Sequence, residues 1–163
     1  MPETKEIVIN TGPLIAIVAA LGDLEILKMY KRACVPLEVC SEILYGGTSR
    51  FAALEFEAAY WLEKWIQSLT PATMLLNALD VGEASVIQLA LNERIRTVCI
   101  DESAGRRMAR LNGLMVTGSV GILLRAKREG HPFSMREAFQ RMKQQGIWLS
   151  QTVEDFALRE AEE

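Results

Sequence analysis

Short apolar runs, rich in β-branched residues, recur along the chain and alternate with segments of helical spacing. Runs without polar interruption are typical of strands that are covered on both faces, as in a parallel sheet. Strands that alternate with helices form right-handed βαβ units. The pattern therefore predicts an α/β protein of three layers, α/β/α, with a parallel central sheet of about four to five strands. The predicted strands lie at residues 7–9, 33–36, 96–100 and 114–118.

Apolar residues at spacings of three and four fill the segments between these strands and predict helices. In the first helix we expect Gly12 as the N-cap and Pro13 at the first helical position. The stretch GGTSR, residues 46–50, is the expected flexible loop. We expect one domain over residues 1–163, with residues 132–163 as a helical extension that packs on the core. The predicted helices lie at residues 13–21, 23–31, 37–45, 51–65, 83–93, 103–112, 119–129, 134–144 and 152–162.

Composition limits the function classes. The formal net charge of −3 excludes a globally basic nucleic-acid surface, although a local basic patch stays open. One histidine and the absence of a C-x-x-C pair argue against zinc, and the three cysteines are expected as buried free thiols in a reducing cytoplasm. The apolar run at residues 13–21 lacks a preceding basic region and is too short to span a membrane. We therefore expect a cytoplasmic location and no membrane partner.

Polar residues end two of the predicted strands. Asn10 follows the first strand, in IVINTGP, and Asp101 and Glu102 follow the third, in VCIDES. In open α/β sheets, ligands bind in the crevice outside the carboxyl ends of the strands. These side chains are therefore candidate site residues, although Asp101 alone also fits a turn or a helix cap.

Two further acids lie on predicted helices with apolar surroundings. Glu42 lies at the edge of a buried stripe, and Glu83 lies in the first turn of its helix, where the helix dipole favours a carboxylate. Taken alone, Glu42 also fits a surface acid and Glu83 an ordinary N-terminal helix acid. Carboxylates that converge at one sheet edge repel one another unless a cation or a proton lies between them. Because hard oxygen ligands select Mg²⁺ or Mn²⁺, convergence would indicate metal-assisted chemistry on a phosphodiester.

Four stretches carry a likeness to a known family: IVINTGPLIAI, CVPLEVCSEIL, LDVGEASVIQLAL and VCIDESAGRRMARLNGLMVTGSVGILLRAKREG. They resemble the PIN-domain superfamily of metal-dependent ribonucleases. Within it, they are most similar to the prokaryotic DUF3368 subgroup of predicted nucleic-acid-binding proteins, which is related to toxin nucleases. The likeness runs from about residue 6 to about residue 145, and the last stretch is the most specific.

The resemblance implies a PIN-like fold with a site of four acids that holds Mg²⁺ or Mn²⁺. The places of these acids fall on Asn10, Glu42, Glu83 and Asp101, and Glu102 is a supplementary ligand. Glu42, Glu83 and Asp101 would be the catalytic carboxylates. The departure from the family is Asn10, whose amide oxygen can coordinate a metal ion but is neutral. The site therefore lacks one negative charge, which puts its activity in doubt.

Polar and cationic residues near this site are candidate nucleic-acid contacts. Thr11 matches the hydroxyl residue that follows the first acid in the family. Arg106 and Arg107 come soon after Asp101 and can either contact phosphates or brace the site. Tryptophans can stack on bases, but packing in the core or in an interface is the alternative for each of them. The three tryptophans are Trp61, Trp65 and Trp148.

The first functional hypothesis is a divalent-metal-dependent ribonuclease that cleaves RNA phosphodiesters, in one form the toxin of a toxin–antitoxin pair with a small antitoxin protein as partner. The alternative is a catalytically weak or inactive PIN fold that binds RNA or a protein. The amphipathic C-terminal segment fits either a cover for the core or a homodimer interface, and the resemblance implies that dimers are common. A small-molecule-binding domain of flavodoxin or Rossmann type is disfavoured because the chain has no G-x-G-x-x-G motif and no P-loop.

Overall fold

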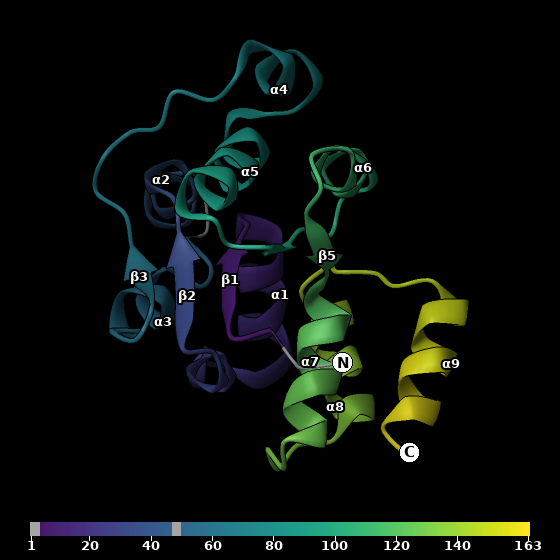
Figure 1. Ribbon diagram of the computed structural model, residues 1–163. Coiled ribbons are helices and arrows are strands. Elements are labelled where there is room, and N and C mark those ends of the chain that lie inside the picture. The colour runs from purple at the N-terminus through teal and green to yellow at the C-terminus, as the bar shows by residue number, and fades with distance from the viewer. Residues whose placement is uncertain (1–3, 47–49) are drawn as a thin grey trace.

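A single parallel sheet organises the computed structural model, which describes residues 4–46 and 50–163 (Figure 1). The sheet has five strands in the order β3-β2-β1-β4-β5, and every neighbouring pair is parallel. Because all strands run the same way, their carboxyl ends share one edge of the sheet. The strands are β1 (Glu6–Ile9), β2 (Arg32–Val35), β3 (Glu63–Lys64), β4 (Thr97–Cys99) and β5 (Met115–Thr117).

Helices cover both faces of this sheet, which confirms the predicted three-layer α/β/α fold. In one layer α2, α5 and α6 pack side by side; in the other, α1 packs against α7 and α8 (Figure 1). The last helix, α9, packs against α7 and α8. The helices are α1 (Thr11–Leu21), a 3₁₀ helix (Glu25–Met29), α2 (Leu37–Tyr45), α3 (Ala53–Ala58), α4 (Thr73–Ala78), α5 (Val81–Glu93), α6 (Ser103–Leu111), α7 (Ser119–Arg128), α8 (Met135–Gln144) and α9 (Gln151–Glu160).

The central strand β1 explains why the apolar runs are uninterrupted. Ile7, Val8 and Ile9 are fully buried, because neighbouring strands flank β1 and helices cover it on both sides. The side chains on both faces of such a strand point into the core, so the strand cannot alternate apolar with polar residues. After these three residues, the first position that accepts a polar residue is Asn10, where β1 ends.

The predicted helix over residues 51–65 is wrong. Helix α3 ends at Ala58, and the chain then forms the short edge strand β3. Leu54, expected in a buried stripe, is 75% exposed. The chain folds back at the end of the helix, where the ammonium group of Lys64 donates hydrogen bonds to the carbonyl oxygens of Phe56 and Glu57 at 2.7 and 3.4 Å.

Strand β3 is only two residues long, and side-chain contacts hold it against the sheet. The Arg32 guanidinium donates two hydrogen bonds to the Glu63 carboxylate, Nε to Oε1 at 3.0 Å and Nη2 to Oε2 at 2.8 Å. The indole N–H of Trp65 and the thiol of Cys34 also donate to Glu63. The hydrogen bonds from Arg32 lower the pKa of Glu63 to about 2. The spacing of apolar residues contains no information on this contact between Arg32 and Glu63, which explains why the sequence analysis did not predict β3.

Other element boundaries also differ from the predictions. The N-cap of α1 is Asn10, not Gly12, so Pro13 is the third helical residue. The segment at residues 23–31 contains only a short 3₁₀ helix, and α4 was not predicted. Residues 47–49 of the expected flexible loop lie outside the described residues. The two C-terminal helices are confirmed, as are the buried free thiols of Cys34, Cys40 and Cys99.

Glu63→Gln should destabilise the protein at pH 7 by up to about 1 kcal/mol, because it removes the charge that Arg32 binds at a partly exposed site. The folded pKa of Glu63 is about 2, below its ordinary value of 4.5, so its contribution is full above pH 4.5 and declines toward pH 2. The difference in midpoint between wild type and variant should therefore shrink as urea denaturation is repeated from pH 7 to pH 3. Glu160→Gln, exposed on α9, is the control. A difference that stays constant with pH would contradict the assignment.

Candidate functional site

The carboxyl edge of the sheet brings together the ends of β1 and β4. Ile9 pairs with Cys99, and the backbone N–H of Asn10 donates to the carbonyl oxygen of Cys99 at 3.1 Å. Asn10 therefore lies beside the segment that carries Asp101 and Glu102. The sequence predicted that the polar strand ends share one edge of the sheet, and the pairing of β1 with β4 makes these two ends neighbours.

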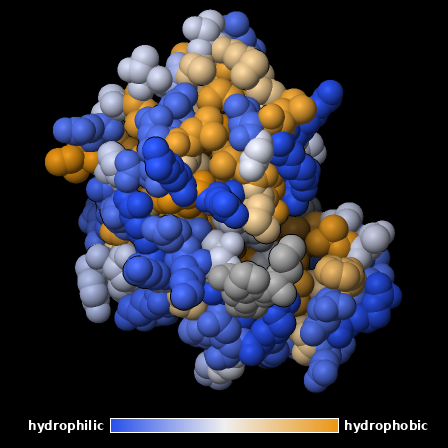
Figure 2. All heavy atoms as spheres, viewed as in Figure 1, coloured by the Kyte–Doolittle hydropathy of each residue, from blue (hydrophilic) through white to orange (hydrophobic). Residues whose placement is uncertain are grey.

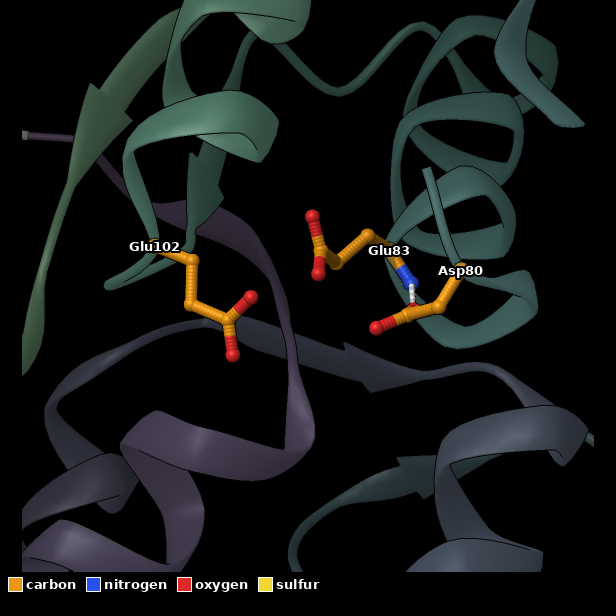
Figure 3. Close-up of side chains that lie close together, drawn as sticks. All are labelled: Asp80, Glu83 and Glu102. Atoms are coloured by element: carbon orange, nitrogen blue, oxygen red, sulfur yellow. Dashed lines mark hydrogen bonds between the residues drawn. The ribbon is translucent and has the colours of Figure 1, made fainter. Parts of the chain in front are cut away.

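Three carboxylates from two helix starts converge at this edge (Figure 3). Asp80, Glu83 and Glu102 each offer an oxygen, and these atoms lie within 4.8 Å of one another. Asp80 is the N-cap of α5, where its Oδ1 accepts a hydrogen bond from the backbone N–H of Glu83 at 2.8 Å. Glu102 is the N-cap residue of α6 and reaches toward α5 from the opposite side (Figure 3). We call these three residues the carboxylate cluster.

The cluster is electrostatically strained. Glu83 is only 4% exposed, and burial together with the carboxyl groups of Asp80 and Glu102 raises its pKa to about 8. None of the ion pairs found among the described residues involves a member of the cluster. Such a group of acids favours either a bound proton or a bound cation.

Glu42 extends this negative edge from α2. Its Oε2 accepts a hydrogen bond from the hydroxyl of Thr11 at 2.9 Å, which ties α2 to the start of α1. Desolvation of the Glu42 carboxyl raises its pKa; the hydrogen bond from Thr11 opposes this shift, and the charges of Asp80 and Glu102 add to it. Thr11 therefore positions a carboxylate, in addition to its predicted role in nucleic-acid binding.

Two helical glycines make room for the carboxylates. A Cβ added at Gly82, the second residue of α5, would lie 2.2 Å from Glu42 Oε1 and 3.5 Å from Asp80 Oδ1. A Cβ at Gly105 of α6 would lie 2.7 Å from Glu83 Oε2. At both positions a carboxylate oxygen thus occupies the space that a side chain would fill.

Asp101 lies at the same edge but engages another partner. Its Oδ1 accepts a hydrogen bond from the backbone N–H of Ser119 at 2.8 Å, at the start of α7. Arg106 Nη1 donates to the carbonyl oxygen of Ile100 at 2.9 Å and so braces the end of β4. Arg107 is exposed on α6. Of the predicted site residues, Glu83 and Glu102 belong to the carboxylate cluster and Glu42 adjoins it, whereas Asp101 holds α7.

Asp80 is the cluster member that sequence reasoning missed. The sequence does contain a signal, because an aspartate three residues before a glutamate at the start of a helix matches the capping box. In the structure only half of that pattern operates. Asp80 caps the helix, while the carboxylate of Glu83 turns toward Glu102 instead of back toward the N-cap (Figure 3).

The donor set fits a hard divalent cation. The cluster offers carboxylate oxygens only, without histidine or cysteine, which is the ligand chemistry of Mg²⁺ and Mn²⁺. Burial, and after it the carboxyl groups of Asp80 and Glu102, raise the pKa of Glu83, and a cation bound at the cluster would oppose that shift.

The model of the family DUF3368, described as a PIN domain, matches residues 6–163, so the chain belongs to this PIN-domain family. PIN domains generally use divalent metal ions and bind nucleic acid. A comparison with the curated proteins finds no match.

Across residues 4–46 and 50–163, no helix combines the length and the apolar character needed to cross a bilayer.

Gly82→Ala should separate stability from metal binding. The added methyl group displaces only the flexible end of Glu42, and alanine favours the helix, so the free energy of unfolding should stay equal or rise by up to about 1 kcal/mol. Affinity for Mn²⁺, measured by calorimetric titration, should fall by roughly tenfold because the Glu42 carboxyl group is displaced from its place beside the cluster. Gly12→Ala is a matched control, since Gly12 is the second residue of α1 and an added Cβ there meets nothing within 4 Å. Equal Mn²⁺ affinity in both variants would contradict this account of the site.

Proposed function

We propose that the protein is a ribonuclease that depends on Mg²⁺ or Mn²⁺ and cleaves phosphodiester bonds of RNA. One observation carries the proposal: Asp80, Glu83 and Glu102 converge within 4.8 Å at the carboxyl edge of a PIN-domain sheet. Carboxylates so placed are suited to hold a hard cation next to a phosphate group. The toxin of a toxin–antitoxin pair, with a small antitoxin as partner, is a narrower form of the proposal that rests on the family resemblance.

The cluster residues would hold the ion, with Glu42 as a further ligand and Asn10 as a neutral one. When bound, such an ion supplies an activated water and neutralises the charge that develops on the phosphate. Other contacts within the chain would hold these ligands in place. Thr11 fixes Glu42, the N-cap of α5 fixes Asp80, and Asp101 holds the start of α7 beside the site.

Asn10 supplies the single observation in favour of a second candidate, a PIN fold that binds RNA without cleaving it. The amide removes one negative charge where the family usually has an acid. In this structure Asp80 adds a carboxylate that sequence reasoning had not counted, and Glu83 already resists ionisation. A further aspartate would increase the repulsion, so a neutral residue at position 10 is compatible with a working site.

The test of the proposal is cleavage of a fluorescent single-stranded RNA in Mn²⁺, with and without a chelator. Wild type should cleave, and chelation should abolish cleavage. Asp80→Asn and Glu83→Gln should each lower the rate by at least about 100-fold, because each removes a charged oxygen from the reaction centre. The exposed Glu160→Gln should cleave as wild type does.

A folded wild type that does not cleave, or cleavage that survives both cluster substitutions, would refute the nuclease proposal. Asn10→Asp then decides between the two candidates. An unchanged rate at saturating Mn²⁺ supports a site that works with the amide, whereas a large gain in both metal affinity and rate supports the binding module.

A further inference from the structure

The segment between α8 and α9 presents an exposed tryptophan close to the candidate site. Trp148 is 73% exposed. The other two tryptophans are partly buried and bonded: Trp61 donates its indole N–H to the carbonyl oxygen of Leu24, and Trp65 donates to Glu63. The packing that was the alternative for all three thus accounts for Trp61 and Trp65 but not for Trp148.

Trp148 lines a groove with a volume of about 580 Å³. This volume is in the range of sites that hold small organic ligands. The walls combine apolar groups with a few polar ones, which is the usual composition of such sites. The groove is lined, among others, by Ser103, Arg106, Thr117, Val120, Trp148 and Val153.

The groove adjoins the carboxylate cluster. Asp101 and Ser103, the two neighbours of Glu102 in the chain, both line it. Asp101 accepts a hydrogen bond from the backbone N–H of Ser119, and Arg106 donates one to the carbonyl oxygen of Ile100. These bonds fix the positions of two side chains that line the groove. Apolar atoms also gather around the upper end of α9, where Val153 forms part of the wall (Figure 2).

We propose that this groove is a nucleobase subsite, in which a base of a single-stranded RNA stacks on the indole of Trp148 while the neighbouring phosphate lies at the carboxylate cluster. The inference rests on the proposed function and names a binding residue for it. A flat, largely apolar ring suits the groove better than a phosphate does, because Val120, Trp148 and Val153 line it. One carboxylate, Asp101, and one guanidinium, Arg106, also line it, so the wall offers a phosphate no net positive charge. Hydroxyl groups of Ser103 and Thr117 offer hydrogen bonds to the edge of a base.

The test measures binding apart from cleavage. In the Glu83→Gln background with Mg²⁺, the fluorescence anisotropy of a labelled single-stranded RNA octamer gives Kd. A second octamer of the same length carries abasic sites throughout and so keeps the phosphates but offers no base. Trp148→Ala should weaken binding of the normal octamer by roughly tenfold to hundredfold, the range for loss of one stacked base, and leave the abasic octamer unchanged.

Two further variants separate stacking from a general surface effect. Trp148→Phe retains an aromatic face and should bind within about threefold of the parent. Tyr60→Ala removes an aromatic ring that is 81% exposed at a place outside the groove, and it should bind as the parent does.

The proposal is overturned if the parent does not bind the octamer, if Trp148→Ala binds as the parent does, or if it loses the same factor on the abasic octamer. It is also overturned if Trp148→Ala changes only the molar mass seen by light scattering, since the groove would then hold a second copy of the chain. The two claims fail separately. Base-dependent binding without cleavage by wild type removes the nuclease proposal alone, and cleavage that ignores Trp148 removes the subsite alone.

Discussion

Parallel pairing of the buried strand β1 with β2 and β4 is the constraint on which the rest of the structure depends. It aligns the ends of β1 and β4 through the hydrogen bond from Asn10 to Cys99, and it places the starts of α1 and α6 at one edge. Helix starts carry capping side chains and favour carboxylates. The fold therefore favours acidic residues at this edge, where the helices that follow the strands begin.

Repulsion at this edge is balanced by packing. The glycines at positions 82 and 105 let α2, α5 and α6 approach so closely that Glu42 and Glu83 lose part of their contact with water. The same closeness accounts for the raised pKa values of Glu42 and Glu83. Asn10, which ends β1 beside the end of β4, is neutral and adds no further negative charge to this edge.

Residue patterns predicted the sheet, most of the helices and two of the three cluster residues. They failed over residues 51–65, where the spacing of Phe51 and Leu54 imitates a buried helical stripe. Lys64 donates to backbone carbonyl oxygens at the end of α3, and Glu63 binds Arg32, a residue of opposite charge that is distant in the sequence. Apolar periodicity contains no information on either contact. Asp80 is a different case. Its capping signal is local, so the sequence alone contained enough information to make it a candidate.

The sequence by itself determined the layer architecture, because fully apolar strands are stable only when helices cover both faces of a parallel sheet. It also determined that polar residues end β1 and β4. Only the tertiary structure decided which acids meet. The partners of each carboxylate depend on how closely α5 approaches α6 and on how α7 is held by Asp101, and distances of a few ångströms between helices are set by packing in three dimensions, which residue spacing along the chain does not encode.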